Sequence, residues 1–249
     1  MELLKDKAII VTGASSGLGR STAIAISKEG GRLILIGRDE TRLSETKNML
    51  EYSDNHIAIP FDLLEFEKYD QLFQRIKEEN IILNGMVHCA GFTRILPIRA
   101  LTTQNMNELL AIHYISFVNL VKFYSKKGMN AGGSIVGISA INAHIPQKCM
   151  TAYASAKAAM ETACRTMSIE LIEKNIRINS VVVGSMSTEM SKDVASSIEG
   201  VSSSYVNPVS RQLIPTVTAD VISGSIMFLL SDLSSYMTGR ELYADGGLL

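Results

Sequence analysis

Tyr153 and Lys157 lie four residues apart in the segment TAYASAKAA, and a phenol beside an ammonium is a pair that can transfer a proton. Residues 152–174 contain no glycine or proline and are rich in alanine, methionine, glutamate and lysine, so they predict one helix. Residues i and i+4 share a helix face. Lys157 should then lower the pKa of Tyr153, as a proton donor to a carbonyl requires. An ordinary exposed lysine near a half-buried tyrosine is the alternative.

A glycine-rich turn, TGASSGLG, follows the first strand-like run of the chain. Residues 7–11 hold the apolar run AIIV of a buried parallel strand, and residues 18–29 are compatible with a helix. Gly13, Gly17 and Gly19 therefore lie between a strand and a helix. Glycines allow a pyrophosphate to approach closely, and the free amides of a helix N-terminus favour its charge. The spacing differs from the common dinucleotide fingerprint, and a plain tight turn is the alternative.

Composition limits the possible classes of protein. The 249 residues suit one α/β domain, and 46% hydrophobic with 20% charged residues is ordinary for a globular core. A formal net charge of −1 and a pI near 6.4 give no preference for nucleic acid or an anionic membrane. No run approaches the roughly 20 apolar residues of a membrane span, and residues 1–6 do not resemble a signal peptide. Three scattered cysteines and four unpaired histidines predict a reduced, cytoplasmic protein without a metal.

Strand-like and helical segments alternate along the chain, which predicts a single doubly wound, seven-stranded parallel sheet with helices on both faces. The expected strands are residues 7–11, 33–36, 57–59, 85–88, 134–138, 178–183 and 241–244. The expected helices after the first are residues 41–52, 69–79, 106–127, 152–174 and 219–230. Residues 185–204 are rich in serine without a clear period, so they predict either a lid over a site or a solvated loop, and we expect a substrate lid region within 185–216.

Several motifs in this order resemble the short-chain dehydrogenases and reductases of about 250 residues. The motifs are TGASSGLG at 12–19, Asp62 after the third strand, HCAG at 88–91, YASAK at 153–157, INSVVVGSMSTEM at 178–190 and YMTGRELYADGG at 236–247. The resemblance implies a Rossmann-like sheet, a cofactor at the carboxyl edge of the strands, and hydride transfer between nicotinamide and a carbonyl or alcohol carbon. It also implies a homotetramer or homodimer assembled through helices 152–174 and 106–127.

The same resemblance implies the residues that bind the cofactor. Asp62 would meet the adenine through its carboxylate and Leu63 through its backbone, and Thr188 would cap the carboxamide or the pyrophosphate. The other implied contacts are Gly13, Ser15, Ser16, Gly17, Leu18, Gly19, Ala90, Gly91, Tyr153, Lys157, Gly184 and Met186. The sequence departs from the family at Val183, where proline usually precedes the glycine, and at His88 and Cys89, where two asparagines usually stand.

The end of the second strand bears on cofactor choice. An NAD enzyme usually places an acidic side chain about 20 residues beyond the glycines, to bind the ribose 2′-hydroxyl. Here the corner reads IGRDETR, so Gly37 presents no carboxylate and Arg38 offers a bidentate guanidinium to a 2′-phosphate. We therefore expect NADP(H) rather than NAD(H). Pairing of Arg38 with Asp39 or Glu40 would leave little selectivity.

The catalytic group departs from the family's tetrad of asparagine, serine, tyrosine and lysine. Tyr153 and Lys157 match, but the serine position, thirteen residues before the tyrosine, holds Ala140. Ser139 could supply the hydroxyl if the strand end is twisted, although strand neighbours point to opposite faces. The asparagine position holds His113, which could keep a water-mediated link to Lys157 because imidazole both donates and accepts.

Two functions follow from these residues. The first is an NADP(H)-dependent ketoreductase or hydroxy dehydrogenase, and the second is a relative that has lost turnover and binds nucleotide as a structural or sensing ligand. A sugar-nucleotide epimerase or dehydratase would need a further C-terminal substrate region. The chain is most similar to 3-oxoacyl-carrier-protein reductases, which would dock an acyl carrier through Lys126, Lys127 and Lys174, although lysines also complement helix C-termini. A sugar, a steroid or a small ketone also remains open as the substrate.

Overall fold

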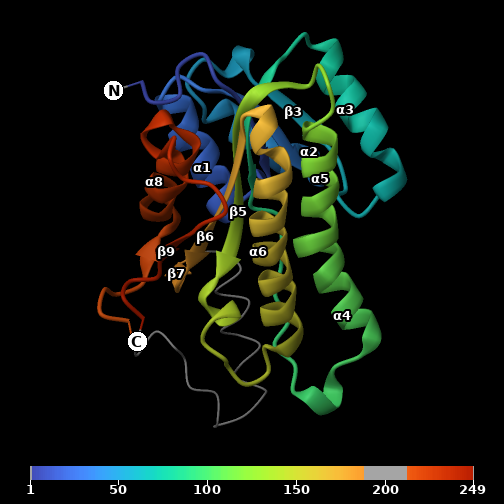
Figure 1. Ribbon diagram of the computed structural model, residues 1–249, viewed down its shortest axis with the longest axis vertical. Coiled ribbons are helices and arrows are strands. Elements are labelled where there is room, and N and C mark those ends of the chain that lie inside the picture. The colour runs from blue at the N-terminus through green and yellow to red at the C-terminus, as the bar shows by residue number, and fades with distance from the viewer. Residues whose placement is uncertain (1, 188–211, 249) are drawn as a thin grey trace.

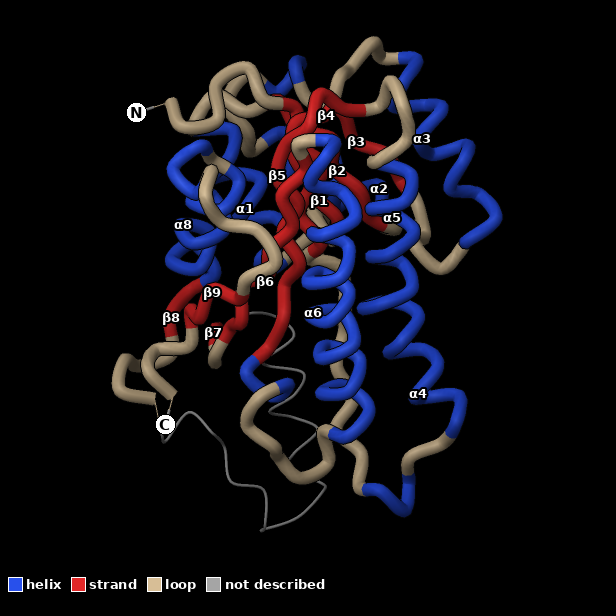
Figure 2. Tube along the Cα trace, viewed as in Figure 1, coloured by secondary structure: helices blue, strands red, loops and turns tan. Residues whose placement is uncertain are grey.

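The computed structural model describes residues 2–187 and 212–248 and contains the expected parallel sheet. Its seven strands lie in the order β3-β2-β1-β4-β5-β6-β9, and every neighbouring pair is parallel. The strands are β1 (Ala8–Thr12), β2 (Arg32–Gly37), β3 (Ile57–Pro60), β4 (Leu83–His88), β5 (Asn130–Ala140), β6 (Ile176–Val183) and β9 (Glu241–Ala244). The sheet forms the middle layer of the molecule, with helices on either side (Figure 2).

Two groups of helices cover the two faces (Figure 1). One face carries α1 (Gly17–Lys28), α2 (Glu40–Asn48) and α8 (Ala219–Leu230). The other carries α3 (Tyr69–Glu78), α5 (Ser116–Tyr124) and α6 (Thr151–Leu171), with α4 (Thr103–Leu110) continuing the line of α5. Short 3₁₀ turns lie at Ser53–Asn55, Phe66–Lys68, Ile98–Ala100, Ile141–Ala143, Ile172–Lys174 and Asp232–Ser234.

The side chains of β1 are buried on both faces of the sheet, and this explains why its sequence is apolar without interruption. Ile10 packs into the core beneath α3, α5 and α6, whereas Ile9 and Val11 pack into the core beneath α1, α2 and α8. Successive side chains of a strand point to opposite faces, so a strand covered on both faces needs apolar residues throughout.

The expected helix at residues 106–127 is interrupted. The structure has α4, then a π-helical turn at Ala111–Ile115, then α5, which ends at Tyr124. The N–H of Ser116 reaches back five residues to the carbonyl of Ala111, and this wider turn is the π geometry. The periodic pattern did not reveal it, because one wide turn hardly changes which residues face the core.

The region expected to be a lid lies mostly outside the described residues, including Thr188. Its described part contains a short strand, β7 (Met186–Ser187), which pairs with β8 (Val217–Thr218) and was not expected. The Gln212 side chain ties the ends of this region to the sheet, since its Oε1 accepts from the N–H of Ser185 and its Nε2 donates to the carbonyl of Asp245. None of the helices in the described ranges is long and apolar enough to cross a membrane.

The strand order places a crevice beside β1. Strand β2 follows β1 in the chain and pairs along one of its edges, and β4 pairs along its other edge. The segments that follow β1 and β4 therefore run away from each other. Ligands of open α/β sheets bind at such a switch point, outside the carboxyl ends of the strands. The glycine turn follows β1 and HCAG follows β4, so both motifs border this crevice.

Candidate active site

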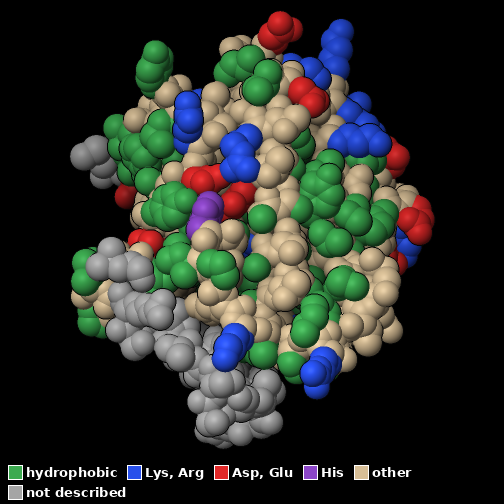
Figure 3. All heavy atoms as spheres, turned by 60° about the horizontal axis from the view of Figure 1, so that its bottom comes forward, with side chains coloured by type: hydrophobic (Ala, Val, Ile, Leu, Met, Phe, Trp, Pro, Cys, Tyr) green, Lys and Arg blue, Asp and Glu red, His purple; other side chains and the backbone are tan. Residues whose placement is uncertain are grey.

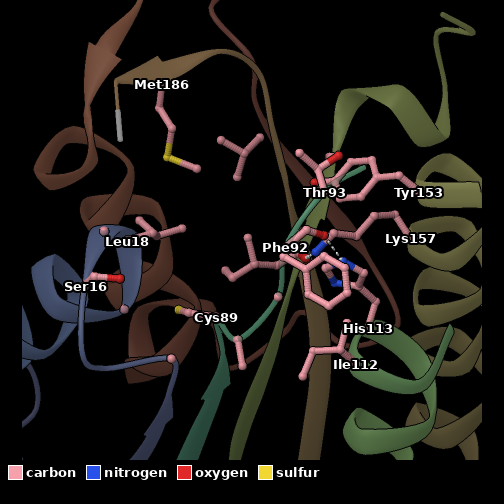
Figure 4. A pocket seen from close by; sticks show the side chains of 18 of the residues that line it. Ser16, Leu18, Cys89, Phe92, Thr93, Ile112, His113, Tyr153, Lys157 and Met186 are labelled. Atoms are coloured by element: carbon pink, nitrogen blue, oxygen red, sulfur yellow. Dashed lines mark hydrogen bonds between the residues drawn. The ribbon is translucent and has the colours of Figure 1, made fainter. Parts of the chain in front are cut away.

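A cavity of about 1160 Å³ lies at the carboxyl edge of the sheet and brings the sequence-predicted residues together (Figure 4). It extends from the glycine turn after β1 to Tyr153 and Lys157 on α6. The expected residues that line it are Gly13, Ser15, Ser16, Gly17, Leu18, Gly19, Arg38, Asp62, Leu63, Ala90, Gly91, His113, Ser139, Tyr153, Lys157, Gly184 and Met186. Their individual roles remain predictions.

The glycine turn is packed too tightly for larger residues. Gly13 has φ +66°, and a Cβ there would lie 2.8 Å from the backbone nitrogen of Ala90. A Cβ on Gly19 would collide with the carbonyl of Gly13. Bare backbone therefore borders the cavity at the N-terminus of α1, where amides and the helix dipole favour an anion. The turn therefore leaves no room for a Cβ at Gly13 or Gly19, because each would collide with backbone of the chain itself.

At the far end of the cavity, Arg38 is exposed and makes no hydrogen bond or ion pair with the described residues. The alternative pairing with Asp39 is not formed, and the Asp39 carboxylate instead accepts from the N–H of Arg42 and caps α2. Gly37 is buried at the same corner. The Arg38 guanidinium is therefore left without a bonded partner among the described residues.

The expected adenine contacts lie on a fixed loop after β3. The carboxylate of Asp62 accepts from the N–H of Leu64 at 3.0 Å. The carbonyl of Leu63 accepts from the buried hydroxyl of Tyr69 at 2.8 Å. These bonds hold the loop at the wall of the cavity.

His88 has a structural position rather than one in the cavity. Its Nε2 donates to the carbonyl of Ile112 at 3.0 Å, so its Nδ1 carries no hydrogen and accepts from the hydroxyl of Thr12. The oxygen of that hydroxyl accepts in turn from the N–H of Ala90. Burial lowers the pKa of His88 to about 3, which keeps the ring neutral. The substitution thus ties β1 and β4 to the π-helical turn. Its neighbour Cys89 lines the cavity.

Tyr153 and Lys157 lie together, but the expected effect of the lysine on the phenol is wrong. The Lys157 Nζ donates to the carbonyl of Ile138 at 2.7 Å and lies 5.7 Å from the centre of the Tyr153 ring. Burial raises the pKa of Tyr153 above its ordinary value of about 10. Burial also lowers the pKa of Lys157 to about 8, against the opposing influence of Cys89 and Glu161. Desolvation outweighs the charge of the ammonium in this site.

Ser139 borders the cavity, but its hydroxyl donates to the carboxylate of Glu161. The same carboxylate accepts from Nε2 of His144 at 2.9 Å. The expected use of Ser139 as a donor to a substrate oxygen therefore conflicts with the observed bond. Ala140 ends β5 beside the cavity and has no hydroxyl. Sequence reasoning missed Glu161, although a carboxylate four residues after Lys157 was a signal on the same helix face.

His113 lies in the π-helical turn with its ring edge-on to Tyr153, at an interplanar angle of 86° and a centroid distance of 5.3 Å. Its Nε2 donates to the carbonyl of Phe92 at 2.8 Å, the dashed line in Figure 4. Burial holds its pKa well below the usual range, so the ring is neutral. A Cβ on Gly91 would collide with this ring, which explains the need for glycine there. The water-mediated link to Lys157 stays a prediction.

The lysines expected to dock an acyl carrier have partners within the chain. Lys126 pairs with Asp70 at 2.8 Å and lies over the ring of Phe123, and Lys174 donates to the carbonyl of Ser125. Lys127 is exposed. These contacts are typical of basic side chains near helix C-termini and do not by themselves indicate a carrier.

One group of side chains in the described ranges has the donors of a metal site. Possible ligand atoms of His144, Glu161 and Glu241 lie within 4.8 Å of one another. Glu161 already accepts from Ser139, and Glu241 pairs with Arg165. We therefore assign no metal to them, and the metal-free site expected from the sequence stays a prediction.

Comparisons with known proteins extend over almost the whole chain. A family model described as "Enoyl-(Acyl carrier protein) reductase" matches residues 13–249. L-xylulose reductase of Caenorhabditis elegans is 30% identical over 246 residues, which cover 97% of this chain and 95% of that protein. The L-rhamnose 1-dehydrogenase (NAD(P)(+)) of Azotobacter vinelandii is 29% identical over 257 residues, covering 99% and 98%.

Solved structures show the same fold. A short-chain type dehydrogenase/reductase from Mycobacterium ulcerans superposes with a TM-score of 0.87 at 25% identity, covering 98% of this chain and 90% of that one. L-sorbose reductase from Gluconobacter frateurii, solved with NADPH and L-sorbose, superposes with a TM-score of 0.90 at 23% identity, covering 100% and 99%.

Proposed function

Since the chain belongs to the short-chain dehydrogenases and reductases, we propose that it is an NADP(H)-dependent oxidoreductase acting on a carbonyl or alcohol carbon of a small molecule. The observation that carries this proposal is the presence of Tyr153 and Lys157 in the same cavity as the glycine turn. A bound nicotinamide would supply or accept the hydride. The glycine turn would hold its diphosphate, Asp62 and Leu63 its adenine, and Lys157 its nearer ribose.

The proton is the part of the reaction that this chain's own residues handle. With its pKa raised, Tyr153 keeps its proton at neutral pH and can give it to the oxygen of a carbonyl that is being reduced. The phenolate that forms then lies near the Lys157 ammonium, which is charged below a pH of about 8. Lys157 thus favours the state after proton transfer more than the state before it, and this difference is what accelerates a reaction.

Tyr153→Phe tests the role of the phenol, because it removes the hydroxyl alone. We expect NADPH affinity to survive, since the remaining contacts of the cavity are unchanged, while ketone reduction falls by orders of magnitude. Tyr52→Phe, at a side chain 78% exposed, is the control. Equal turnover by the Tyr153 variant and the parent protein on a real substrate would exclude Tyr153 as the acid.

The preference for NADP(H) is tested at Arg38. If its guanidinium clamps the 2′-phosphate, Arg38→Ala should weaken NADPH binding and leave NADH binding nearly unchanged. Arg75→Ala removes an exposed charge on α3, away from the cavity, and should change neither. Equal affinity of the parent protein for NADPH and NADH, measured by fluorescence titration, would contradict the proposal.

The relatives named above act, by their names, on small molecules, and this supports a small substrate rather than a carrier-bound acyl group. The internal contacts of Lys126 and Lys174 point the same way. Saturable turnover of free ketones or alcohols, with no gain from an acyl carrier, is the expected result.

A second candidate function is nucleotide binding without turnover. The observation that favours it is the lack of a free serine hydroxyl, since Ala140 has none and Ser139 donates to Glu161. Loss of one donor to the reacting oxygen typically costs about 10²–10³ in rate. Ala140→Ser should therefore raise the rate of a weak enzyme. If neither it nor the parent protein reduces any ketone or oxidises any alcohol while both bind NADPH, the binding function is the correct one.

A further inference from the structure

Two buried histidines link the end of β4 and its following loop to the π-helical turn, and their hydrogen bonds run in opposite directions. His88 ends β4 and donates from Nε2 to the carbonyl of Ile112 in the turn at 3.0 Å. His113, the next residue of the turn, donates from Nε2 to the carbonyl of Phe92 in the loop at 2.8 Å. The Ile112 carbonyl also accepts from the Ser116 hydroxyl, but that bond lies within the helix, whereas His88 ties the carbonyl to the sheet. Each segment therefore both gives and receives a bond.

The two rings are held in one state. A carbonyl oxygen only accepts, so Nε2 carries the hydrogen in both histidines. Each ring is 1% exposed, and desolvation lowers the pKa of His88 to about 3 and that of His113 well below its usual range. The His113 ring also packs against Gly91, where a Cβ would collide with it. Both rings are therefore uncharged donors at neutral pH, and the His113 ring has little room to turn.

The ring of His113 contacts the proposed proton donor. It meets the Tyr153 ring edge-on, at 86° and a centroid distance of 5.3 Å, which is an arrangement that aromatic rings prefer. The hydroxyl of Tyr153 makes no hydrogen bond with the described residues, so the packing of its ring sets its position. Figure 4 shows Tyr153, His113 and Phe92 at one end of the cavity. A shift of the His113 ring would therefore shift the phenol.

We propose that His88 and His113 form a reciprocal clamp that positions the phenol of Tyr153. The His113 ring contacts the phenol directly, and His88 acts through it by fixing the turn that carries it. This proposal rests on the proposed function, because the position of the hydroxyl matters only if Tyr153 transfers a proton. Proton transfer needs the hydroxyl within hydrogen-bond reach of the substrate oxygen, so a small displacement greatly lowers the rate. Both histidines stand where the family usually has asparagine, and the clamp gives one physical reason for both departures.

A first experiment replaces His88, which is buried outside the lining of the cavity. His88→Gln keeps an amide donor at about the reach of the imidazole Nε2, whereas the amide of His88→Asn is one methylene shorter and loses the carbonyl of Ile112. We expect His88→Asn to lower kcat by at least about 10-fold, with little change in KM or NADPH affinity. His88→Gln should keep most of the parent kcat. The parent kcat in both variants would overturn the proposal.

A second experiment separates positioning from a general loss of structure, by measuring kcat in H₂O and in D₂O on the best ketone or alcohol substrate of the parent protein. A displaced phenol slows proton transfer relative to the other steps of turnover. The ratio of the two kcat values should therefore rise in His88→Asn and in His113→Gln, which keeps a donor but lacks the ring. An unchanged ratio in both variants would show that the phenol has not moved, and the proposal would fail.

The double variant tests whether the two histidines act as one unit. It should lose no more kcat than the worse single variant, because either change alone already opens the clamp. Losses that multiply would show two independent effects and would contradict the clamp.

His56 supplies a matched control. It is also buried, at 4% exposed, and its Nε2 donates to the carbonyl of Glu51 while its Nδ1 accepts from the N–H of Leu33, but it lies outside the lining of the cavity. His56→Asn should lower the Tm and leave kcat and the isotope ratio unchanged. If His88→Asn likewise lowers only the Tm, the inference fails while the proposed function stands. A parent protein that turns over no ketone or alcohol would contradict the proposed function itself.

Discussion

At the scale of single residues, burial sets the ionisation of the catalytic pair. Lys157 is 5% exposed, and its pKa falls to about 8, while that of Tyr153 rises. A Lys157 ammonium opposite a protonated phenol is thus the arrangement at neutral pH. Cys89 and Glu161 oppose this fall in the pKa of Lys157, and the Lys157 Nζ donates to the carbonyl of Ile138.

We predict that stability rises between about pH 8 and pH 10 because of Lys157. Unfolded lysine titrates near 10.4, so in this window the unfolded state binds more protons than the folded one and the free energy of unfolding increases with pH. The slope from one such group is about 1.4 kcal/mol per pH unit. Chemical denaturation at several pH values should show that Lys157→Met removes this rise. An unchanged slope in the variant would mean that Lys157 titrates normally in the folded protein.

Glu161 supports the charge of Lys157, because its carboxylate raises the lysine pKa. Glu161→Gln should therefore lower that pKa and move the alkaline limb of the kcat/KM profile to lower pH. Glu170→Gln, at an exposed position on the same helix, is the control and should leave the profile in place. A loss of activity that is the same at every pH would instead indicate a merely structural role for Glu161.

At the scale of elements, the turn after β1 packs closely against helix α1, and this contact forms the phosphate site that we propose. It depends on Gly19, where a Cβ would collide with the backbone of Gly13. Helix α8 contains a glycine of the opposite kind: Gly224 is exposed, and a Cβ there would meet nothing within 4 Å. The close packing of α1 therefore requires glycine at position 19, whereas Gly224 only lowers the stability of helix α8.

Gly19→Ala and Gly224→Ala should consequently have opposite effects. The first should abolish or strongly weaken NADPH binding and lower the Tm, because backbone must shift. The second should keep binding and stabilise the protein by up to about 1 kcal/mol, the difference in helix propensity between glycine and alanine. Thermal unfolding with and without NADPH measures both, and normal NADPH affinity in Gly19→Ala would refute the proposed phosphate site.

At the scale of the whole molecule, apolar side chains are exposed on α6, on the 3₁₀ turn after it and on the π-helical turn between α4 and α5. Figure 3 shows exposed hydrophobic side chains spread over one face of the molecule. Ile169 is 77% exposed, Ile172 48%, Ile115 39% and Tyr114 36%. Exposed apolar side chains can contribute to protein–protein interfaces, and these segments adjoin the helices through which the sequence predicts a dimer or tetramer.

Ile169→Glu should weaken that association, because it places a charge at an apolar contact. Light scattering after size exclusion should show an oligomer for the parent protein and a smaller species for the variant. Ile82→Glu, at a 50% exposed isoleucine before β4, is the control and should keep the parent size. A parent protein that is monomeric at all concentrations would contradict the expected assembly.

The sequence by itself determined the sheet, the family and the composition of the cavity. Short continuous apolar runs bounded by turn residues predict buried parallel strands, and a glycine-rich segment between a strand and a helix predicts a tight turn because glycine adopts positive φ at little cost. These local patterns predicted the seven strands of the sheet, and the family resemblance predicted the residues that line the cavity, whereas the spatial order of the strands came from the tertiary structure.

The tertiary structure alone decided what each polar group is bonded to. The Ser139 hydroxyl donates to the carboxylate of Glu161, 22 residues away. His113 donates to the carbonyl of Phe92 from a π-helical turn that no periodic pattern revealed. The pKa of Tyr153 rises although a lysine lies four residues away, because the desolvation of the phenol outweighs the influence of the nearby ammonium. Hydrogen-bond partners and desolvation depend on segments that meet only when the chain has folded, and they set the chemistry of the site.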